Sequence, residues 1–132
     1  MAHQADKLGL FIGTGTSAAG ADRPRSRGIY RGELDTATGA LTITGLAAEL
    51  TNPTFLARTP DGRRLYAVSE IGDYDGASSG AVAAYAVDPT SGALTLLNMQ
   101  SSGGAGPAYV ALDRTGRIVL VANYGAGSVA SL

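Results

Sequence analysis

The chain has 132 residues, with 10 basic and 11 acidic residues, no cysteine and 19 glycines. This length suits one ordinary domain, and the lack of cysteine excludes disulfides and zinc–thiolate sites and fits a reducing cytoplasm, where we expect the protein. The balanced charge includes no basic stripe, so we expect no nucleic-acid partner. No apolar run is long enough to cross a bilayer, and no signal-peptide core follows the polar start, so we expect no membrane partner.

The chain opens with a polar tail, residues 1–7, which contains the only histidine, His3, expected to be solvated and idle. An apolar strand then leads into "GTGTSA" at 13–18, which fits the dinucleotide-binding fingerprint G-x-G-x-x-G/A. That fingerprint needs a helix, but the following residues include Pro24 and show no apolar face. We therefore expect a strand end and a loop at this place.

A ten-residue phrase occurs twice: "DTATGALTIT" at 35–44 returns as "DPTSGALTLL" at 88–97, 53 residues later. Each copy is typical of a hairpin turn. The aspartate, Asp35 or Asp88, accepts backbone N–H groups, and the glycine, Gly39 or Gly92, takes the left-handed conformation. The phrase therefore predicts the same turn in two successive structural units.

Other segments repeat at nearly the same distance. "NPTFLA" (52–57) matches "GPAYVA" (106–111), and "PDGRRLYAVSE" (60–70) matches "RTGRIVLVANY" (114–124), both 54 residues apart. The complete unit predicts four short strands at about 53–58, 64–69, 80–87 and 93–99. A period near 50 residues with four strands per unit is that of a β-propeller blade, and no segment shows helical apolar spacing.

The predicted fold class is therefore all-β: blades that are four-stranded antiparallel sheets, in a partial, incomplete ring. After the tail, residues 8–132 form the partial propeller, with blade strands at 8–46, a complete blade at 53–99 and the start of the next at 107–132. A ring of four to eight blades needs about 200–400 residues. We expect the N-terminal part of a larger propeller, or a chain that self-associates through its open blade edges.

Candidate functional residues lie at predicted strand ends. Glu70 is the candidate catalytic carboxylate, suited to orienting a hydroxyl or activating water, with a structural hydrogen bond as the alternative. Asn123 and Tyr124, at the equivalent strand end, are candidate substrate ligands for a polyol, or they lock a turn. Gly103 and Gly104 lie in "SSGGAGP" (101–107), whose N–H groups suit a phosphate; the alternative is a flexible connection.

"DYDG" at 73–76 is similar to the start of a calcium loop. The calcium-binding pattern needs a glutamate eleven residues after its first ligand, and counting from Asp73 gives Ala84. A turn is the preferred interpretation, and we expect no metal site.

Three quoted stretches carry a resemblance to a known family: "GIYRGELDTATGALT", "NPTFLARTPDGRRLYAVSEIGDYDG" and "GAVAAYAVDPTSGALTLLNMQSSGGAGPAYVALDRTGRIVLVANYGAGSV". The chain resembles the seven-bladed β-propeller lactonases of the 6-phosphogluconolactonase type. The resemblance implies hydrolysis of a sugar lactone in the pentose phosphate pathway, with the lactone as the small-molecule partner and without a metal or other cofactor.

The chain departs from this family at one candidate position. Where members usually carry Cys-His after Gly-Pro, this sequence has Ala108-Tyr109, which makes Tyr109 a further candidate substrate ligand. The resemblance places the family's catalytic His and Arg in blades that this chain lacks, so we expect the 132 residues alone to be inactive. Two alternatives stay open: a non-catalytic propeller module for binding or scaffolding, since "VLVANYGAGSV" (119–129) also looks like a surface-protein propeller repeat, and an inactive truncated product.

Overall fold

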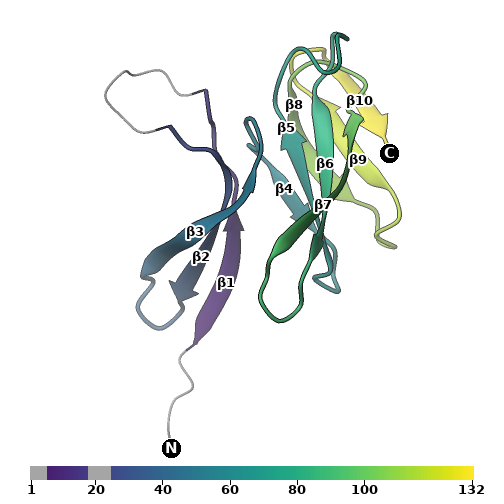
Figure 1. Cartoon of the computed structure of the whole chain (residues 1–132). Helices are drawn as coiled ribbons and strands as arrows, with labels where there is room; N and C mark the ends of the chain where they lie inside the picture. The colour runs from purple at the N-terminus through teal and green to yellow at the C-terminus, as the bar shows by residue number, and fades with distance from the viewer. Residues whose placement is uncertain (1–5, 18–24) are drawn as a thin grey trace, which may run out of the picture.

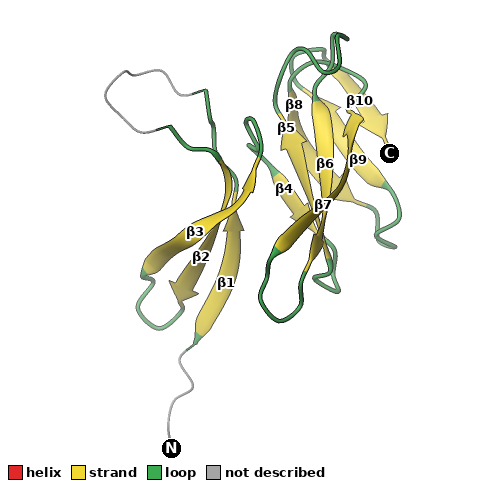
Figure 2. Cartoon of the chain, in the orientation of Figure 1, coloured by secondary structure: helices red, strands yellow, loops and turns green. Residues whose placement is uncertain are grey.

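Three antiparallel sheets lie side by side in the computed structural model, which describes residues 6–17 and 25–132 (Figure 1). The described residues form strands joined by turns and loops, and none of them is helical (Figure 2). The strands are β1 (Lys7–Ile12), β2 (Gly28–Asp35), β3 (Leu41–Glu49), β4 (Leu56–Arg58), β5 (Arg64–Ser69), β6 (Ala81–Val87), β7 (Leu94–Ser101), β8 (Pro107–Leu112), β9 (Val119–Asn123) and β10 (Ser128–Ser131).

The sheets have the strand orders β1-β2-β3, β4-β5-β6-β7 and β10-β9-β8, with every neighbouring pair antiparallel. We call them the N-terminal, middle and C-terminal sheets. The middle sheet is the complete four-stranded unit that the repeat predicts, and the predicted strand 64–69 coincides with β5. In the repeat alignment, β1–β3 correspond to β5–β7 and β8–β10 to β4–β6. The predicted all-β fold of four-stranded antiparallel blades is confirmed.

The repeated phrase forms the two hairpin turns that it predicts. Asp35 Oδ1 accepts the N–H of Ala37 and of Thr38, each at 3.0 Å, and Gly39 has a φ of 75°. Asp88 Oδ1 accepts the N–H of Thr90 at 3.0 Å and that of Ser91 at 2.6 Å, while Gly92 has a φ of 69°. Hydrogen bonds from these turn N–H groups lower the pKa of both carboxyl groups.

The core consists of two layers, one on each face of the middle sheet. Because side chains alternate along a strand, Leu65 and Ala67 of β5 point to the N-terminal sheet, whereas Val68 points to the C-terminal sheet. Buried residues of the first layer are Ile29, Leu50, Leu65, Ala67, Ala83, Tyr85 and Val87. Those of the second layer are Val68, Val82, Val110, Val119 and Val121. The layers hold the three sheets in the fanned arrangement of a propeller section.

The connections gather at two opposite ends of the sheets (Figure 1). The hairpin turns 36–40, 59–63, 88–93 and 113–118 lie at one end. The segments 13–17, 50–55, 70–80, 102–106 and 124–127 lie at the other, which we call the loop end. Glu70, Tyr124, Gly103 and Gly104 all belong to this end.

Candidate active site

Glu70 directly follows β5 and is partly buried at the loop end. Its Oε2 accepts a hydrogen bond from the hydroxyl of Thr54, just before the edge strand β4. Its backbone N–H donates to the carbonyl oxygen of Asn52 at 3.0 Å. Among the described residues, none donates a hydrogen bond to Oε1.

Asn52 connects the Glu70 segment to the N-terminal sheet. Its Oδ1 accepts the N–H of Thr16 at 2.8 Å and that of Ser17 at 3.1 Å, and its Nδ2 donates to the Glu70 carbonyl at 3.2 Å. Asn52 has a φ of 46°, a left-handed conformation that asparagine tolerates better than most residues. Asn52 is not among the residues that the sequence predicted for the site. Its alignment with Gly106, which has a φ of 63°, could have indicated a left-handed backbone at this position.

A cavity of about 490 Å³ opens beside these residues, between the N-terminal and middle sheets. Thr16 and Ser69 line it, and the ion pair of Arg27 with Glu49 lies at its exposed side. The Ser69 hydroxyl donates to the carbonyl of Thr51 at 2.7 Å. Hydroxyl, guanidinium and carboxylate groups in one cavity match the hydrogen-bonding needs of a sugar derivative.

The glycine-rich loop packs closely against the C-terminal sheet. A Cβ on Gly104 would lie 2.6 Å from the Ser128 hydroxyl and 2.9 Å from Asn123 Nδ2, so this close approach requires glycine. The carbonyl oxygen of Gly104 accepts the N–H of Gly80 at 2.8 Å. Gly103 is exposed and its N–H donates to the Ser101 hydroxyl at 3.1 Å. Both glycines therefore have structural contacts, and their role toward a phosphate stays a prediction.

Asn123 and Tyr124 are neighbours with opposite surroundings. Asn123 is 1% exposed; its Nδ2 donates to the Ser102 carbonyl at 2.8 Å, and its buried Oδ1 has no hydrogen-bond partner among the described residues. Tyr124 is 85% exposed, and its N–H donates to the Gly106 carbonyl at 2.8 Å. Tyr124 is thus accessible to a ligand, whereas Asn123 faces the packed interior; both stay predicted ligands.

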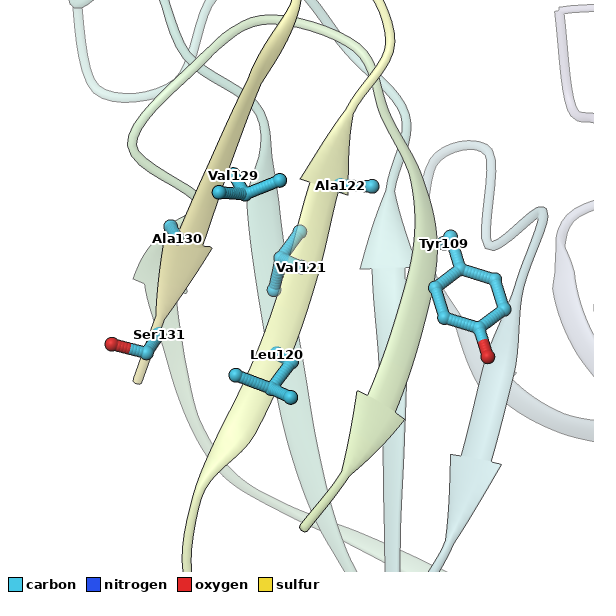
Figure 3. Close-up of a pocket in the computed structure, with 7 residues that line it drawn as sticks. All are labelled: Tyr109, Leu120, Val121, Ala122, Val129, Ala130 and Ser131. Atoms are coloured by element: carbon cyan, nitrogen blue, oxygen red, sulfur yellow. The ribbon is translucent and has the colours of Figure 1, made fainter.

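Tyr109 lies on β8, where its ring stacks at a tilt on that of Phe55, with the centroids 4.6 Å apart. The two residues occupy equivalent positions in the 54-residue repeat. Tyr109 is 49% exposed and lines an apolar hollow on the C-terminal sheet (Figure 3). An exposed aromatic ring offers a surface on which a sugar ring packs.

Hydrogen bonds connect several candidate segments in one row. The N–H of Gly106 donates to the carbonyl of Ile71 at 2.9 Å, and the Gly106 carbonyl accepts the N–H of Tyr124. The Glu70 segment, the glycine-rich loop and Tyr124 are therefore contiguous at the loop end. Tyr109 and Asn123 are placed on the C-terminal sheet itself.

Two motifs have the structures that the sequence predicted for them, a strand end with a loop and a turn. Residues 13–17 of "GTGTSA" form a strand end and a bend, and a Cβ on Gly13 would lie 2.0 Å from the Pro53 carbonyl oxygen. "DYDG" forms a turn in which Asp73 Oδ1 accepts the N–H of Gly76 at 3.3 Å. His3 lies outside the described residues.

The fold defines a section of a β-propeller with its candidate site among the loops at one end. Comparison with known proteins gives the family: residues 9–132 match the model described as "Lactonase, 7-bladed beta-propeller". The chain belongs to this lactonase family.

Individual proteins similar to this chain are also named as lactonases. The 6-phosphogluconolactonase of Bacillus subtilis is 41% identical over 119 residues, which cover 90% of this chain and 31% of that protein. The crystal structure of a candidate 6-phosphogluconolactonase from Bacteroides uniformis matches with a TM-score of 0.79 and 38% identity, over 96% of this chain and 33% of that one. The periplasmic gluconolactonase of Pseudomonas aeruginosa matches with a TM-score of 0.80 and 33% identity, over 96% and 34%. The chain thus spans about a third of the length of these proteins.

The structure contains, within its described parts, no helix with the length and apolar character needed to cross a membrane.

Proposed function

We propose that this chain forms part of a hydrolase that opens a sugar lactone of the 6-phosphogluconolactone class to the aldonic acid, a step of the pentose phosphate pathway. The observation that carries the proposal is the family match over residues 9–132, together with a polar loop end that holds Glu70. Since the chain spans about a third of its relatives, we assign the activity to the larger propeller. The 132 residues alone are expected to give only the spontaneous rate.

Glu70 is proposed as the general base. Lactone opening needs a water molecule to attack the carbonyl carbon, the ring C–O bond to break and a proton to reach the departing ring oxygen. The Thr54 hydroxyl fixes Oε2 of Glu70, which leaves Oε1 to take the proton of the attacking water and return it to the leaving oxygen. This role needs no co-reactant other than water.

The other candidates are proposed to hold the substrate. The exposed phenol of Tyr124 donates to, or accepts from, a hydroxyl of the polyol. The enclosed amide of Asn123 supports this end of the sheet through its hydrogen bond to the Ser102 carbonyl. The ring of Tyr109 supports an apolar sugar face. Gly103 and Gly104 contribute backbone to an anion site for the phosphate.

A chimera tests the proposal. The segment of the Bacillus subtilis enzyme that aligns with this chain is replaced by residues 9–132, and acid release from 6-phosphogluconolactone is followed against the spontaneous reaction. We expect saturable hydrolysis by the chimera and none by the isolated 132-residue chain. A folded chimera without a rate above the spontaneous one would show that this segment does not support the reaction.

We propose a cytoplasmic location, supported by the cysteine-free composition. The periplasmic relative makes this a point to test by fractionating cells that express the native gene. Recovery with the periplasmic fraction would contradict it.

A further inference from the structure

The dipeptide Asp-Gly occurs twice in the sequence, as Asp61-Gly62 and as Asp75-Gly76. An aspartate before glycine can rearrange, because the amide nitrogen of the glycine attacks the side-chain carboxyl group and no Cβ hinders its approach. In a folded protein the reaction depends on whether the nitrogen and the carboxyl carbon can meet. The two dipeptides of this chain differ in this respect.

Asp61 is held by its own turn. Its Oδ1 accepts the hydroxyl of Thr59 at 2.6 Å and the N–H of Arg63 at 2.9 Å. The N–H of Gly62, whose nitrogen would attack, donates to the carbonyl of Thr59 at 2.8 Å. The hydrogen bond from the Thr59 hydroxyl is the main reason why the pKa of Asp61 is lowered, so this carboxyl group is ionised and lacks the OH that has to leave. Both reacting groups are therefore occupied.

The turn of Asp61 also closes a strand ladder. The N–H of Thr59 donates to the carbonyl of Arg64 at 3.0 Å, directly beside the pairing of Arg58 with Leu65 in β4 and β5. Leu65 is 2% exposed in the core between two sheets. Opening this turn therefore disturbs the edge of the core, and segments of this kind open rarely.

Asp75 has a less restrained carboxyl group. Among the residues that the structure describes, none donates a hydrogen bond to this carboxylate. The N–H of Gly76 donates to Asp73 Oδ1 at 3.3 Å, which is longer than the 2.8 Å hydrogen bond of the Gly62 N–H. Asp75 and Gly76 are both exposed. The attacking nitrogen and the carboxyl group are thus held more weakly here than at Asp61.

The turn around Asp75 is small and isolated. It lies in the loop between β5 and β6 (Figure 1), where Tyr74 and Ala77 form a single bridge with two N–H···O hydrogen bonds of 3.1 Å. Asp75 has a φ of 56°, a left-handed conformation that is unfavourable for a residue with a Cβ. Residues 75–78 are exposed, and exposed hydrogen bonds with few buried contacts are typical of a segment that opens locally. This turn is therefore expected to open more often than that of Asp61.

The exposure of this loop does not come from the ends of the sequence. The loop belongs to the middle sheet, which has all four strands and a neighbouring sheet on each face.

We propose that Asp75 isomerises spontaneously to isoaspartate, and that the turn of Asp61 protects that residue from the same reaction. The Gly76 nitrogen forms a bond to Cγ of Asp75, and the carboxyl OH and the amide hydrogen leave as water, which closes a succinimide ring. A water molecule then adds and breaks the bond between this nitrogen and the backbone carbonyl carbon of Asp75, so that the main chain runs through Cγ. One water is lost and one is gained, and no other reactant is needed.

The product changes the loop that begins at Glu70. Isoaspartate adds a methylene group to the main chain between the two partners of the Tyr74–Ala77 bridge, which is expected to break. The hydroxyl of Tyr74 also donates to the carbonyl of Met99 in β7 at 3.3 Å, and this contact should be weakened with the bridge. The rearrangement therefore alters a loop at the loop end as the protein ages.

Timed incubation of the folded chain at neutral pH tests the proposal. Trypsin separates the two sites, because Asp61 lies in the peptide 59–63 and Asp75 in the peptide 65–114. Labelling by an isoaspartyl methyltransferase measures isoaspartate in each peptide, and resistance to an aspartate-specific protease before residue 75 gives the position. Circular dichroism checks the fold, and the chimera with the Bacillus subtilis enzyme provides a second folded sample.

We expect isoaspartate to accumulate several-fold faster in the peptide 65–114 than in the peptide 59–63. In urea both sites should react at similar rates, because unfolding removes the protection of Asp61. Asp75→Glu is the matched control: it keeps the charge, but its longer side chain would have to close a larger ring, so the signal from 65–114 should disappear. Equal rates in the folded protein, no isoaspartate at Asp75 there, or a signal that persists in Asp75→Glu would each overturn the proposal.

Discussion

Asn52 and Gly106 hold the same backbone position in successive repeat units, 54 residues apart. The carbonyl of Asn52 accepts the N–H of Glu70 at 3.0 Å, and the carbonyl of Gly106 accepts that of Tyr124 at 2.8 Å. Both residues have positive φ, 46° and 63°. The repeat thus preserves a left-handed residue that supports the segment after β5 and the segment after β9. Of these two residues, only Asn52 has a side chain.

Substitutions at Asn52 separate the conformation from the side chain. Asn52→Gly removes the hydrogen bonds to Thr16 and Ser17 but keeps an easy left-handed backbone, whereas Asn52→Ala also introduces strain. We expect Asn52→Ala to lower the free energy of unfolding by about 1 kcal/mol more than Asn52→Gly does. Urea unfolding of the two variants measures this. Equal midpoints would mean that backbone strain at this position is unimportant.

Gly13 and Gly15 form a matched pair for a steric prediction. A Cβ on Gly13 would lie 2.0 Å from the backbone oxygen of Pro53, whereas a Cβ on Gly15 meets nothing within 4 Å. We expect Gly13→Ala to destabilise the protein by about 1–3 kcal/mol, as overpacking does, and Gly15→Ala to change stability little. Thermal unfolding of both variants decides. A stable Gly13→Ala protein would contradict the close contact between strand end and loop.

Leu65 and Leu41 allow a buried leucine to be compared with an exposed one by the same substitution. Leu65 is 2% exposed between two sheets, and Leu41 is 54% exposed. Leu65→Ala should lower the free energy of unfolding by about 2–5 kcal/mol, because it leaves a cavity. Leu41→Ala should cost less than about 0.5 kcal/mol in dilute protein. Urea unfolding of the two variants measures the difference.

The extent to which the sequence predicts this structure differs between strands and loops. The predicted strand 64–69 matches β5 because alternating apolar residues and a turn on each side define it. The predicted strand 53–58 is shorter in the structure, where β4 is Leu56–Arg58. Residues 53–55 lie outside it because Asn52 turns the chain with its left-handed backbone and the proline at 53 has no N–H to donate. Periodicity predicts the ladders, and local backbone chemistry limits their ends.

Contacts between distant residues account for what sequence analysis missed. The hydrogen bonds of Asn52 with Thr16 span 36 residues and depend on how two sheets pack, which no local pattern reveals. Asn123 shows the same limit: its strand-end position left a polyol ligand and a turn-locking residue as open alternatives, and only the packing of the glycine-rich loop shows that the amide is enclosed. The sequence does indicate Glu70 as a candidate, because a carboxylate at a strand end can be recognised from the strand pattern. It does not indicate that the Thr54 hydroxyl binds this carboxylate.

Glu70→Gln tests the proposed general base in the chimera with the Bacillus subtilis enzyme. The amide oxygen of glutamine still accepts the Thr54 hydroxyl, so stability should be unchanged while proton transfer is lost. We expect kcat to fall by about 100-fold or more with little change in KM. Thr54→Val serves as the comparison, since it removes the hydrogen bond that orients the carboxylate but keeps the base. A Glu70→Gln enzyme with normal kcat would assign Glu70 a structural role only.

Asp113 gives a prediction for acid stability at the turn end of the molecule. The Thr115 hydroxyl donates to Oδ2 at 2.5 Å and the N–H groups of Arg117 and Ile118 donate to Oδ1 at 2.9 Å, which lowers the pKa of this carboxyl well below its usual range. A group whose pKa is lower in the folded state stabilises fully above its unfolded pKa of about 3.9, and this contribution is lost as the pH falls toward the folded pKa. Asp113→Asn keeps the shape and an acceptor oxygen but has no charge to lose. The stability gap between the unmodified protein and Asp113→Asn should therefore be constant from neutral pH to about pH 5 and shrink below about pH 4. Urea unfolding across this range measures the gap, and a gap that is independent of pH would show that the charge of Asp113 contributes nothing to the turn.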